Sequence, residues 1–466
     1  MESITIIGPP GTGKTYYIEQ MIKGMNQSNY LYLTYNVSMA QHARGMIEDD
    51  RHKIGTIHSI MAQKNGFTPP YIKLQDMLEF AKRYGLTYAK SLDEWAGQSE
   101  LERFLRYYDR TENLMEKPRQ PANESLNMPY LFDEYKKWKE MQGKKDYTDI
   151  LIEASKNKYY ADVVFVDESQ DLSPLMWKII DNIECEKRYI VGDPHQSINE
   201  FRGVRIQDFI KRIEKKTILE KSYRFGDNIR MLGDTILGKA KMMDIKYRGI
   251  GNTEIDRHDI NSFTRLPGSK AILCRTNSLA YMLANKLPYA MVPINPEHAY
   301  GNGWTKTTFK VAGIMKKWPH VEPEEFRYIV EHSPADLWVR GTKAKVKKEM
   351  TLFSYDLMKK KMDPLEIIGK LNIDQKTKDN ARRLMVDDTP MIYIDTIHAA
   401  KGLEWDHVII ANDFPQRLEV TDEERRLFYV AVTRAKKTLD FIRTGYYQSA
   451  FPLPVYPKTL NITEIL

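Results

Sequence analysis

Residues 8–15 read GPPGTGKT, and this glycine-rich stretch decides the fold. The apolar run 1–7 precedes it as a short buried strand, and residues 16–25 follow with their apolar side chains on one helical face. This order is typical of a phosphate-binding loop, whose backbone N–H groups surround phosphate oxygens at the positive end of the helix. The sequence therefore predicts nucleoside-triphosphate binding; the alternative is a glycine turn without function.

Six residues of this loop are expected to contact the nucleotide. Lys14 is placed to reach the β- and γ-phosphates, and the Thr15 hydroxyl is placed to bind Mg²⁺. The expected contacts are Gly8, Gly11, Thr12, Gly13, Lys14 and Thr15.

A second motif, VVFVDESQDLSP, occupies residues 163–174. Four apolar residues of a buried strand end in Asp167 and Glu168, so both carboxylates lie at its exposed end. Asp167 is placed to hold Mg²⁺, and Glu168 to orient and deprotonate the attacking water. The alternative, in which these acids cap a helix in solvent, is weaker beside a phosphate loop. Together the two motifs predict hydrolysis of ATP with Mg²⁺ as cofactor.

The rest of the chain alternates short apolar strands with helices, which indicates parallel sheets with right-handed crossovers. Two helical, charged stretches interrupt this pattern. The predicted fold class is therefore α/β, with two parallel-sheet cores that each carry a mostly helical insertion. The predicted division is 1–61 and 144–215 for the first core, 62–143 for its insertion, 216–283 and 388–450 for the second core, 284–387 for its insertion, and 451–466 for an irregular tail.

The composition sets weaker limits. The 466 residues carry a formal net charge of +7, which supports a polyanionic partner only weakly; a mixed soluble surface explains it equally well. Cys185 and Cys274 lie in apolar stretches and are interpreted as reduced core residues. The sequence shows no apolar run of membrane-spanning length and no signal-peptide pattern, which favours a cytoplasmic protein without a membrane partner.

A series of motifs follows one another along the chain. They are DESQD (167–171), VGDPHQSINEFRG (191–203), SYR (222–224), IDTIHAAKGLEWDHVII (394–410) and EERRLFYVAVTRAKKTL (423–439). In order and approximate spacing they resemble the motifs of superfamily-1 DNA helicases of the UvrD, Rep and PcrA group. The resemblance implies two RecA-like P-loop domains with ATP between them. It also implies 3′→5′ translocation on single-stranded DNA and unwinding at single-strand–duplex junctions.

The resemblance implies roles for residues outside the phosphate loop. Arg224 and Arg434 occupy the positions of the family's two γ-phosphate arginines, where they would offset the charge that develops during phosphoryl transfer. Gln196 would sense the γ-phosphate, Glu404 would bind the ribose side of the nucleotide, and Tyr223 would stack on the adenine. For each arginine the alternative is a surface ion pair, which the motif context disfavours.

Adenine recognition departs from the family pattern. The family has a glutamine-containing segment ahead of its phosphate loop, whereas seven residues without a glutamine precede the loop here. Tyr16 stands where the family commonly has arginine. We expect Tyr16 and Tyr223 to sandwich the base, which would hold a purine without reading its edge and give weak discrimination among purine triphosphates. The alternative is that Tyr16 packs inward on its helix.

LTYNVSMAQHAR (33–44) and GTIHSI (55–60) are similar to the family's DNA motifs, and the resemblance therefore implies a track for single-stranded DNA. Such a track must tolerate any base and relies on stacking and backbone contacts. Tyr35 and Phe201 would stack on bases, with core packing as the alternative. Thr56 and His58 would contact phosphates. His398 and Lys401 would contact the strand or relay between the two sites. Metal ligation by the histidines is disfavoured, because no partner ligands lie at suitable spacing. The full expected set is Tyr35, Asn36, Thr56, His58, Phe201, Arg202, Thr396, His398 and Lys401.

Two other functions stay open. The insertions are short for the family, so a translocase that remodels nucleoprotein without efficient unwinding is one alternative. The other is a nucleotide-gated nucleic-acid-binding module, which Glu168 and the two arginines disfavour. RNA also stays open as the strand, because backbone contacts do not identify the sugar. Tyr446 or Tyr447 is the candidate for a wedge at the duplex junction, and the sequence indicates no particular protein partner.

Overall fold

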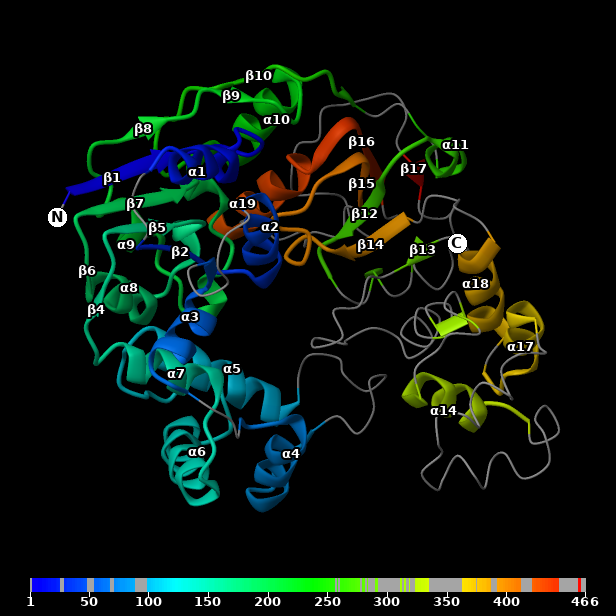
Figure 1. Cartoon of the computed structure of the whole chain (residues 1–466), viewed down its shortest axis with the longest axis horizontal. Coiled ribbons are helices and arrows are strands. Elements are labelled where there is room, and N and C mark those ends of the chain that lie inside the picture. Colours follow the sequence, from blue (N-terminus) through cyan, green and yellow to red (C-terminus); the bar gives the residue numbers. More distant parts are fainter. Residues whose placement is uncertain are drawn as a thin grey trace.

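The computed structural model describes residues 2–25, 29–47, 54–67, 71–88, 99–255, 258, 260–276, 279–280, 283, 290–291, 311, 314–315, 318, 323–334, 363–373, 375–386, 392–411, 421–443 and 460–461. They form two main parallel sheets with helices packed around them, and the helices α4 to α7 lie to one side of the first sheet (Figure 1). Within these residues, no helix has both the length and the apolar character that a bilayer crossing needs.

The first sheet has six strands in the order β3-β2-β5-β7-β1-β8, and its pairings are parallel. Its central strands are runs of buried apolar residues, as expected for a parallel sheet that helices cover on both faces. The carboxyl ends of β1, β5 and β7 meet at one edge, where the phosphate loop, Asp167 and Asp193 follow them. The bounds are β1 Glu2–Ile7, β2 Tyr30–Thr34, β3 Ile54–Thr56, β5 Val163–Val166, β7 Lys187–Gly192 and β8 Thr217–Ile218.

Helices cover this sheet and begin where the sequence supplies caps. For α8, the Ser173 hydroxyl accepts a hydrogen bond from the N–H of Met176, and Pro174 fills the first helical position. Trp177 on the same helix is buried in the core below the sheet. The bounds are α1 Lys14–Lys23, α2 Val37–Ile47, α3 Ile57–Lys64, α7 Tyr147–Ala154, α8 Pro174–Asp181 and α9 Ile206–Ile210, with a small sheet of β4 Tyr159–Tyr160 and β6 Ile183–Glu184.

The first insertion has an aromatic core of its own, built by α4 (Leu74–Arg83), α5 (Glu100–Asn113) and α6 (Met128–Gln142). The Phe80 ring lies at its centre, with ring centroids 5.5 Å from Phe104 and 5.1 Å from Tyr135. This core explains why the segment is rich in aromatic residues. The insertion therefore folds as a helical unit beside the first sheet.

The second sheet follows the path β11-β16-β15-β12-β14-β13, with β17 paired to β16, and its pairings are also parallel. Its strands are β11 Glu254–Ile255, β12 Lys270–Cys274, β13 Ala290–Met291, β14 Ile392–Thr396, β15 Trp405–Ala411, β16 Ala435–Arg443 and β17 Leu460–Asn461. Its helices are α10 Asp227–Leu237, α11 Ile260–Arg265 and α19 Asp422–Val432, with a separate strand pair β9 Lys221–Ser222 and β10 Arg248–Gly249.

The described part of the second insertion is helical. It comprises α14 (Pro323–Glu331), α17 (Pro364–Lys370) and α18 (Gln375–Val386), whose buried side chains share one apolar cluster with Val311 and Ile314. The wedge candidates Tyr446 and Tyr447 lie outside the described residues.

The predicted α/β class with two parallel sheets is confirmed, and three short strands differ from the predicted division. Strand β8 pairs with β1 in the first sheet, although residues 217–218 were assigned to the second core. Strand β13 pairs with β14 although it lies in the predicted helical insertion, and β17 forms inside the tail that was expected to be irregular. Each has only two residues, too few for an alternating or apolar pattern to be read.

Cys185 and Cys274 are not joined in a disulfide. Cys274 is buried on β12, whereas Cys185 is only half-buried and packs at the edge of the first core.

Candidate functional site

The phosphate loop turns at two glycines with left-handed backbone. Gly11 has a φ of 73° and Gly13 a φ of 79°, a region that residues with a side chain rarely adopt. Lys14 Nζ donates a hydrogen bond to the carbonyl oxygen of Gly8 at 2.9 Å and lies 3.7 Å from Glu168 Oε1. The loop, its lysine and the N-terminus of α1 therefore converge on one point, as an anion site requires.

Thr15 and Asp167 lie side by side at the end of β5. The Thr15 hydroxyl donates to Asp167 Oδ2 at 3.4 Å, and the buried Tyr32 hydroxyl donates to the same oxygen at 2.5 Å. Burial and the neighbouring Glu168 charge raise the pKa of Asp167 to about 6.

This pair fits the predicted magnesium position. A hydroxyl and a carboxylate are hard oxygen ligands, which Mg²⁺ takes together with substrate phosphates. Among the described residues, no group of three or more His, Cys, Asp or Glu side chains is placed to hold a metal, so a site that phosphates complete is the arrangement that fits. A bound ion would neutralise charge on those phosphates.

Glu168 has a backbone conformation that is rare for a glutamate, with a φ of 53°. The Gln170 amide donates to Glu168 Oε2, and Gln170 Oε1 accepts from the N–H of Asp193 at 3.1 Å. Burial acts to raise the pKa of Glu168, but Lys14, Lys401 and the Gln170 hydrogen bond outweigh it and lower the pKa below its ordinary value. The carboxylate is therefore ionised at neutral pH, as a general base must be.

The opposite wall of the site comes from the second domain and centres on Arg434, which is fully buried. Its Nε donates to Val430 O at 2.9 Å, Nη1 to Leu403 O at 3.2 Å and Nη2 to Gln196 Oε1 at 3.1 Å. Gln196 Nε2 in turn donates to Asp193 Oδ2 at 2.8 Å. Burial, and after it the positive charge of Arg224, lower the pKa of Arg434 to about 9. An anion that enters the cleft would supply the missing counter-charge.

Arg224 reaches the same space from the segment that follows β9. Its Nε lies 2.6 Å from Glu404 Oε2, and its Nη1 donates to Thr433 O at 3.0 Å. The same segment is bonded to the phosphate loop, since the N–H of Tyr223 donates to Gly11 O at 2.9 Å. A Cβ atom at Gly11 would lie 2.5 Å from the Arg224 Cβ, so only glycine permits this close approach.

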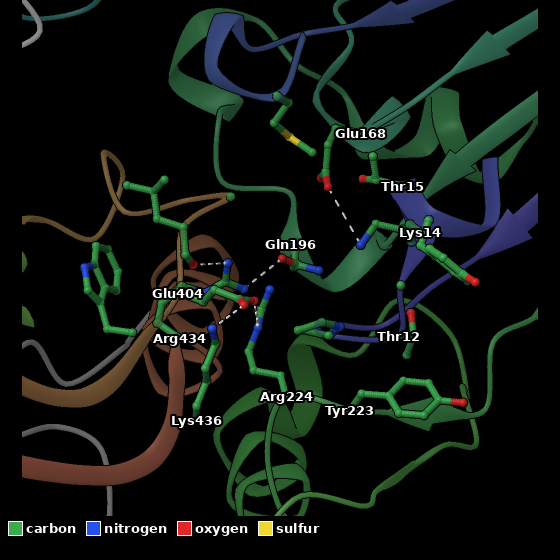
Figure 2. Close-up of a pocket in the computed structure, with 18 of the residues that line it drawn as sticks. Thr12, Lys14, Thr15, Glu168, Gln196, Tyr223, Arg224, Glu404, Arg434 and Lys436 are labelled. Carbon is green, nitrogen blue, oxygen red and sulfur yellow. Dashed lines mark hydrogen bonds and ion pairs between the residues drawn. The ribbon is translucent and has the colours of Figure 1, made fainter. Parts of the chain in front are cut away.

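These residues line one cleft between the two domains, with a volume of about 890 Å³. Figure 2 shows Lys14, Thr15 and Glu168 on one side and Arg434 on the other, with Gln196 between them. Of the residues predicted to bind or hydrolyse the nucleotide, all but Gly8 and Asp167 line the cleft. The cleft has the size and the polar groups that a nucleoside triphosphate needs.

Tyr16 and Tyr223, the two residues predicted to sandwich the base, both line the cleft. Both side chains are open to solvent. Tyr16 is 59% exposed and Tyr223 67% exposed. The alternative in which Tyr16 packs inward on its helix is therefore wrong. The sandwich of the base between the two rings stays a prediction.

Four of the predicted DNA residues, from both domains, form one series of contacts. Arg202 Nη1 donates to the Tyr35 hydroxyl at 2.9 Å, and the guanidinium lies 5.4 Å from the Phe201 ring centroid. The Phe201 ring meets the His398 ring edge to face, with centroids 5.6 Å apart. Phe201 is 44% exposed and is not a core residue, whereas Tyr35 is half-buried. An exposed phenyl ring beside an arginine suits base stacking and phosphate contact.

Three other predicted DNA residues begin helices or turns. Thr56 caps α3, where its hydroxyl accepts from the backbone N–H three residues later, and Thr396 does the same at the turn after β14. The Asn36 carbonyl accepts from the N–H of Ala40 at the start of α2. Such N-terminal turns present backbone N–H groups, which are ordinary phosphate contacts.

Burial lowers the pKa of both predicted DNA histidines, His58 and His398, to about 4. Both rings are therefore neutral at physiological pH. Lys401 is not placed for a contact with the DNA strand, because its Nζ donates to Asp171 and to the Gln196 carbonyl oxygen. Its position favours the relay alternative.

Several residues at the site were not predicted. Tyr32, Gln170 and Lys436 contact Asp167, Glu168 and Glu404 respectively, but none of the three was singled out in the sequence. Tyr147 is 65% exposed and stacks on Tyr71 at 5.7 Å, beside His58. For Gln170 and Lys436 a signal existed, because they lie within the motifs DESQD (167–171) and EERRLFYVAVTRAKKTL (423–439).

Comparison with known families agrees with this geometry. Residues 345–445 match the UvrD-like helicase C-terminal domain, and residues 1–202 match an AAA domain. These matches, and relatives named as DNA helicases, support a superfamily-1 helicase of the UvrD/Rep type. The AAA match includes Lys14 and Glu168, and the UvrD-like match includes Arg434, so the two walls of the cleft fall in two different family matches.

Individual relatives of this helicase type are distant. F-box DNA helicase 1 of Gallus gallus is 26% identical, and the match covers 94% of this chain and 47% of that protein. A probable DNA helicase II homolog of Mycoplasma pneumoniae is 23% identical and matches over 94% of this chain and 81% of its own length. The chain thus spans half or less of the F-box relatives. Among solved structures, an arterivirus nonstructural protein 10 (helicase) with DNA has 12% identity and a TM-score of 0.37, over 96% of this chain and 62% of that chain.

The Tyr32 hydroxyl yields a prediction about magnesium. The substitution Tyr32→Phe removes the donor that stabilises the ionised Asp167 carboxylate. The Mg²⁺ concentration that half-saturates ATP hydrolysis should rise about tenfold, the usual effect of losing a hydrogen bond behind a metal ligand. The rate at saturating Mg²⁺ should stay near that of the wild type. The measurement is ATPase rate against Mg²⁺ concentration, with Tyr189→Phe on strand β7 of the same sheet as control. An unchanged Mg²⁺ dependence would contradict the role of Tyr32.

Proposed function

We propose that the protein is an ATP-driven motor that moves 3′→5′ on single-stranded DNA and unwinds duplex at single-strand–duplex junctions. One observation carries the proposal. Arg434 and Arg224 of the second domain line the same cleft as Lys14 and Glu168 of the first, and Gln196 is hydrogen-bonded to Arg434 across it. Closure of the two domains on a nucleotide would therefore assemble a hydrolytic site.

Hydrolysis would use groups from both walls. Glu168 accepts a proton from the attacking water, the water oxygen bonds to the γ-phosphorus, and the bond to the β–γ bridging oxygen breaks to give ADP and inorganic phosphate. Lys14, Arg224 and Arg434 offset the charge on the phosphoryl oxygens. Thr15 and Asp167 would hold Mg²⁺. Glu168 is anionic, and Arg434 is cationic at neutral pH because its pKa stays at about 9, so both groups have the charge that their roles require.

Coupling to DNA would run through the segment that joins Gln196 to Phe201 and Arg202. Arg426 on α19 is fully buried and holds this segment, with Nε donating to Ser197 O at 2.8 Å. Lys401 also bonds Gln196 through its carbonyl oxygen. Loss of the γ-phosphate at Gln196 would therefore shift a segment whose other end carries the exposed Phe201 ring.

Strand displacement tests the motor. On two partial duplexes with either a 3′ or a 5′ single-stranded tail, only the 3′-tailed substrate should be unwound, in the presence of ATP and Mg²⁺. Glu168→Gln should lower the ATPase rate by at least about 100-fold, because the base is lost, while nucleotide binding remains.

The other outcomes decide between the alternatives. DNA-stimulated hydrolysis without displacement of either duplex would indicate a translocase that does not unwind. Displacement of only the 5′-tailed substrate would overturn the polarity. Binding of nucleotide and DNA without multiple-turnover hydrolysis would indicate a gated binding module.

Base selectivity tests the two exposed tyrosines. If Tyr16 and Tyr223 sandwich the base, ATP and GTP should be hydrolysed with similar kcat/KM, and UTP less well because a pyrimidine stacks over a smaller area. Tyr16→Ala and Tyr223→Ala should each raise the KM for ATP and for GTP by about tenfold, the size of one stacking contact. Steady-state kinetics with the three nucleotides measures this. Equal turnover of UTP and ATP by the wild type would show that neither ring stacks on the base.

A further inference from the structure

The Glu404 carboxylate holds two cations in the nucleotide cleft, one on each oxygen. Arg224 Nε lies 2.6 Å from Oε2, and Lys436 Nζ lies 2.7 Å from Oε1 (Figure 2). Burial acts to raise the pKa of Glu404, but the charges and hydrogen bonds of Arg224 and Lys436 outweigh it and lower the pKa to about 2. Glu404 is thus an anion whose two oxygens are already engaged by side chains of the protein.

The contact with Glu404 fixes the orientation of Arg224. The guanidinium is planar, and it is held at Nε by Glu404 and at Nη1 by the Thr433 carbonyl oxygen, 3.0 Å away. Contacts at two different nitrogens fix the plane of the group. A long arginine side chain loses conformational entropy when it is fixed in one geometry. Because these contacts fix Arg224 before a phosphate binds, that entropy is not lost during the reaction.

Lys436 is placed by the sheet itself. It is the second residue of β16, and Glu404 comes directly before β15, whose first residue Trp405 pairs with Ala435. The register of the two strands therefore brings Lys436 and Glu404 together at the edge of the cleft. Lys437, the next residue, points elsewhere: its Nζ lies 3.6 Å from Asp406, and its side chain is 61% exposed.

We propose that Lys436 and Glu404 are positioning residues that hold Arg224 in the geometry in which it meets the γ-phosphate. The chain of contacts runs from Lys436 through Glu404 to Arg224, and Arg224 alone of the three touches the phosphate. The proposal rests on the proposed ATP hydrolysis. It gives Glu404 a role different from the ribose contact that the family resemblance implies, and it gives Lys436 a role in turnover.

The test is a double-mutant cycle on ATPase kinetics with saturating single-stranded oligo-dT. Lys436→Met should lower kcat about two- to fivefold, the effect expected for a partly exposed ion pair, and should leave the KM for ATP nearly unchanged. In an Arg224→Ala background, assayed at higher protein concentration, Lys436→Met should have no further effect, because the group that it positions is gone. Lys436→Arg should retain the rate, and Lys437→Met is the matched control.

Three results would overturn the proposal. The first is that Lys436→Met does not change kcat in an active protein. The second is an equal loss from Lys436→Met with and without Arg224, which would mean that Lys436 acts independently of that arginine. The third concerns the ribose: Glu404→Ala would raise the KM for ATP but not that for 2′,3′-dideoxy-ATP if Glu404 bound the sugar hydroxyls. A wild-type protein without DNA-stimulated hydrolysis would instead refute the proposed function, and with it the assignment of Arg224 to the phosphate.

Discussion

The buried hydrogen bond between Arg434 and Gln196 is the contact on which both domains depend. A guanidinium without water must have acceptors, and Arg434 finds them in two carbonyls of its own domain and in one amide oxygen of the other. Gln196 is held in turn by Asp193, directly after β7. The arrangement joins the edge of one sheet to the edge of the other, so the cleft between them is built from both.

The same junction links the two ligand sites. The segment from Asp193 to Arg202 begins beside the nucleotide cleft and ends at the exposed Phe201 ring, and α19 holds it through Arg426. Arg434 ends the turn that follows this helix. A charge change in the cleft therefore acts on elements that also carry the DNA-side residues, without an additional transmitting domain. The coupling rests on the tightly packed contact between the two domains, because close-packed side chains transmit a shift from one site to the other.

The sequence predicted the parts of the structure that short-range patterns encode. A strand, a glycine loop and a helix in succession, and an acidic pair at the end of an apolar run, fix Lys14 and Asp167 relative to their own strands. Because the carboxyl ends of parallel strands meet at one edge, the two halves of the phosphate site could be joined without a structure. The resemblance supplied Arg224, Arg434 and Gln196, and the cleft includes all three.

Other parts depend on pairings that no local pattern reveals. Tyr32 looks like an ordinary aromatic residue of a buried strand, and only the register of β2 against β5 brings its hydroxyl to Asp167. Lys436 meets Glu404 because β15 and β16 pair, and Lys401 turns inward because Asp171 and Gln196 offer it partners. Side-chain direction at these positions is decided by tertiary contacts rather than by the motif that contains them.

The most direct test of the shared cleft is the steady-state ATPase rate of Arg434→Lys with saturating single-stranded DNA. Arg425→Lys on α19 is the control, because Arg425 bonds the carbonyl oxygen of Ile236 within the second domain. A lysine cannot make the separate bonds of the buried guanidinium, so kcat should fall by about 10³-fold while binding of a fluorescent ATP analogue remains. A kcat close to that of the wild type would contradict the account, because hydrolysis would then proceed without the second wall of the cleft.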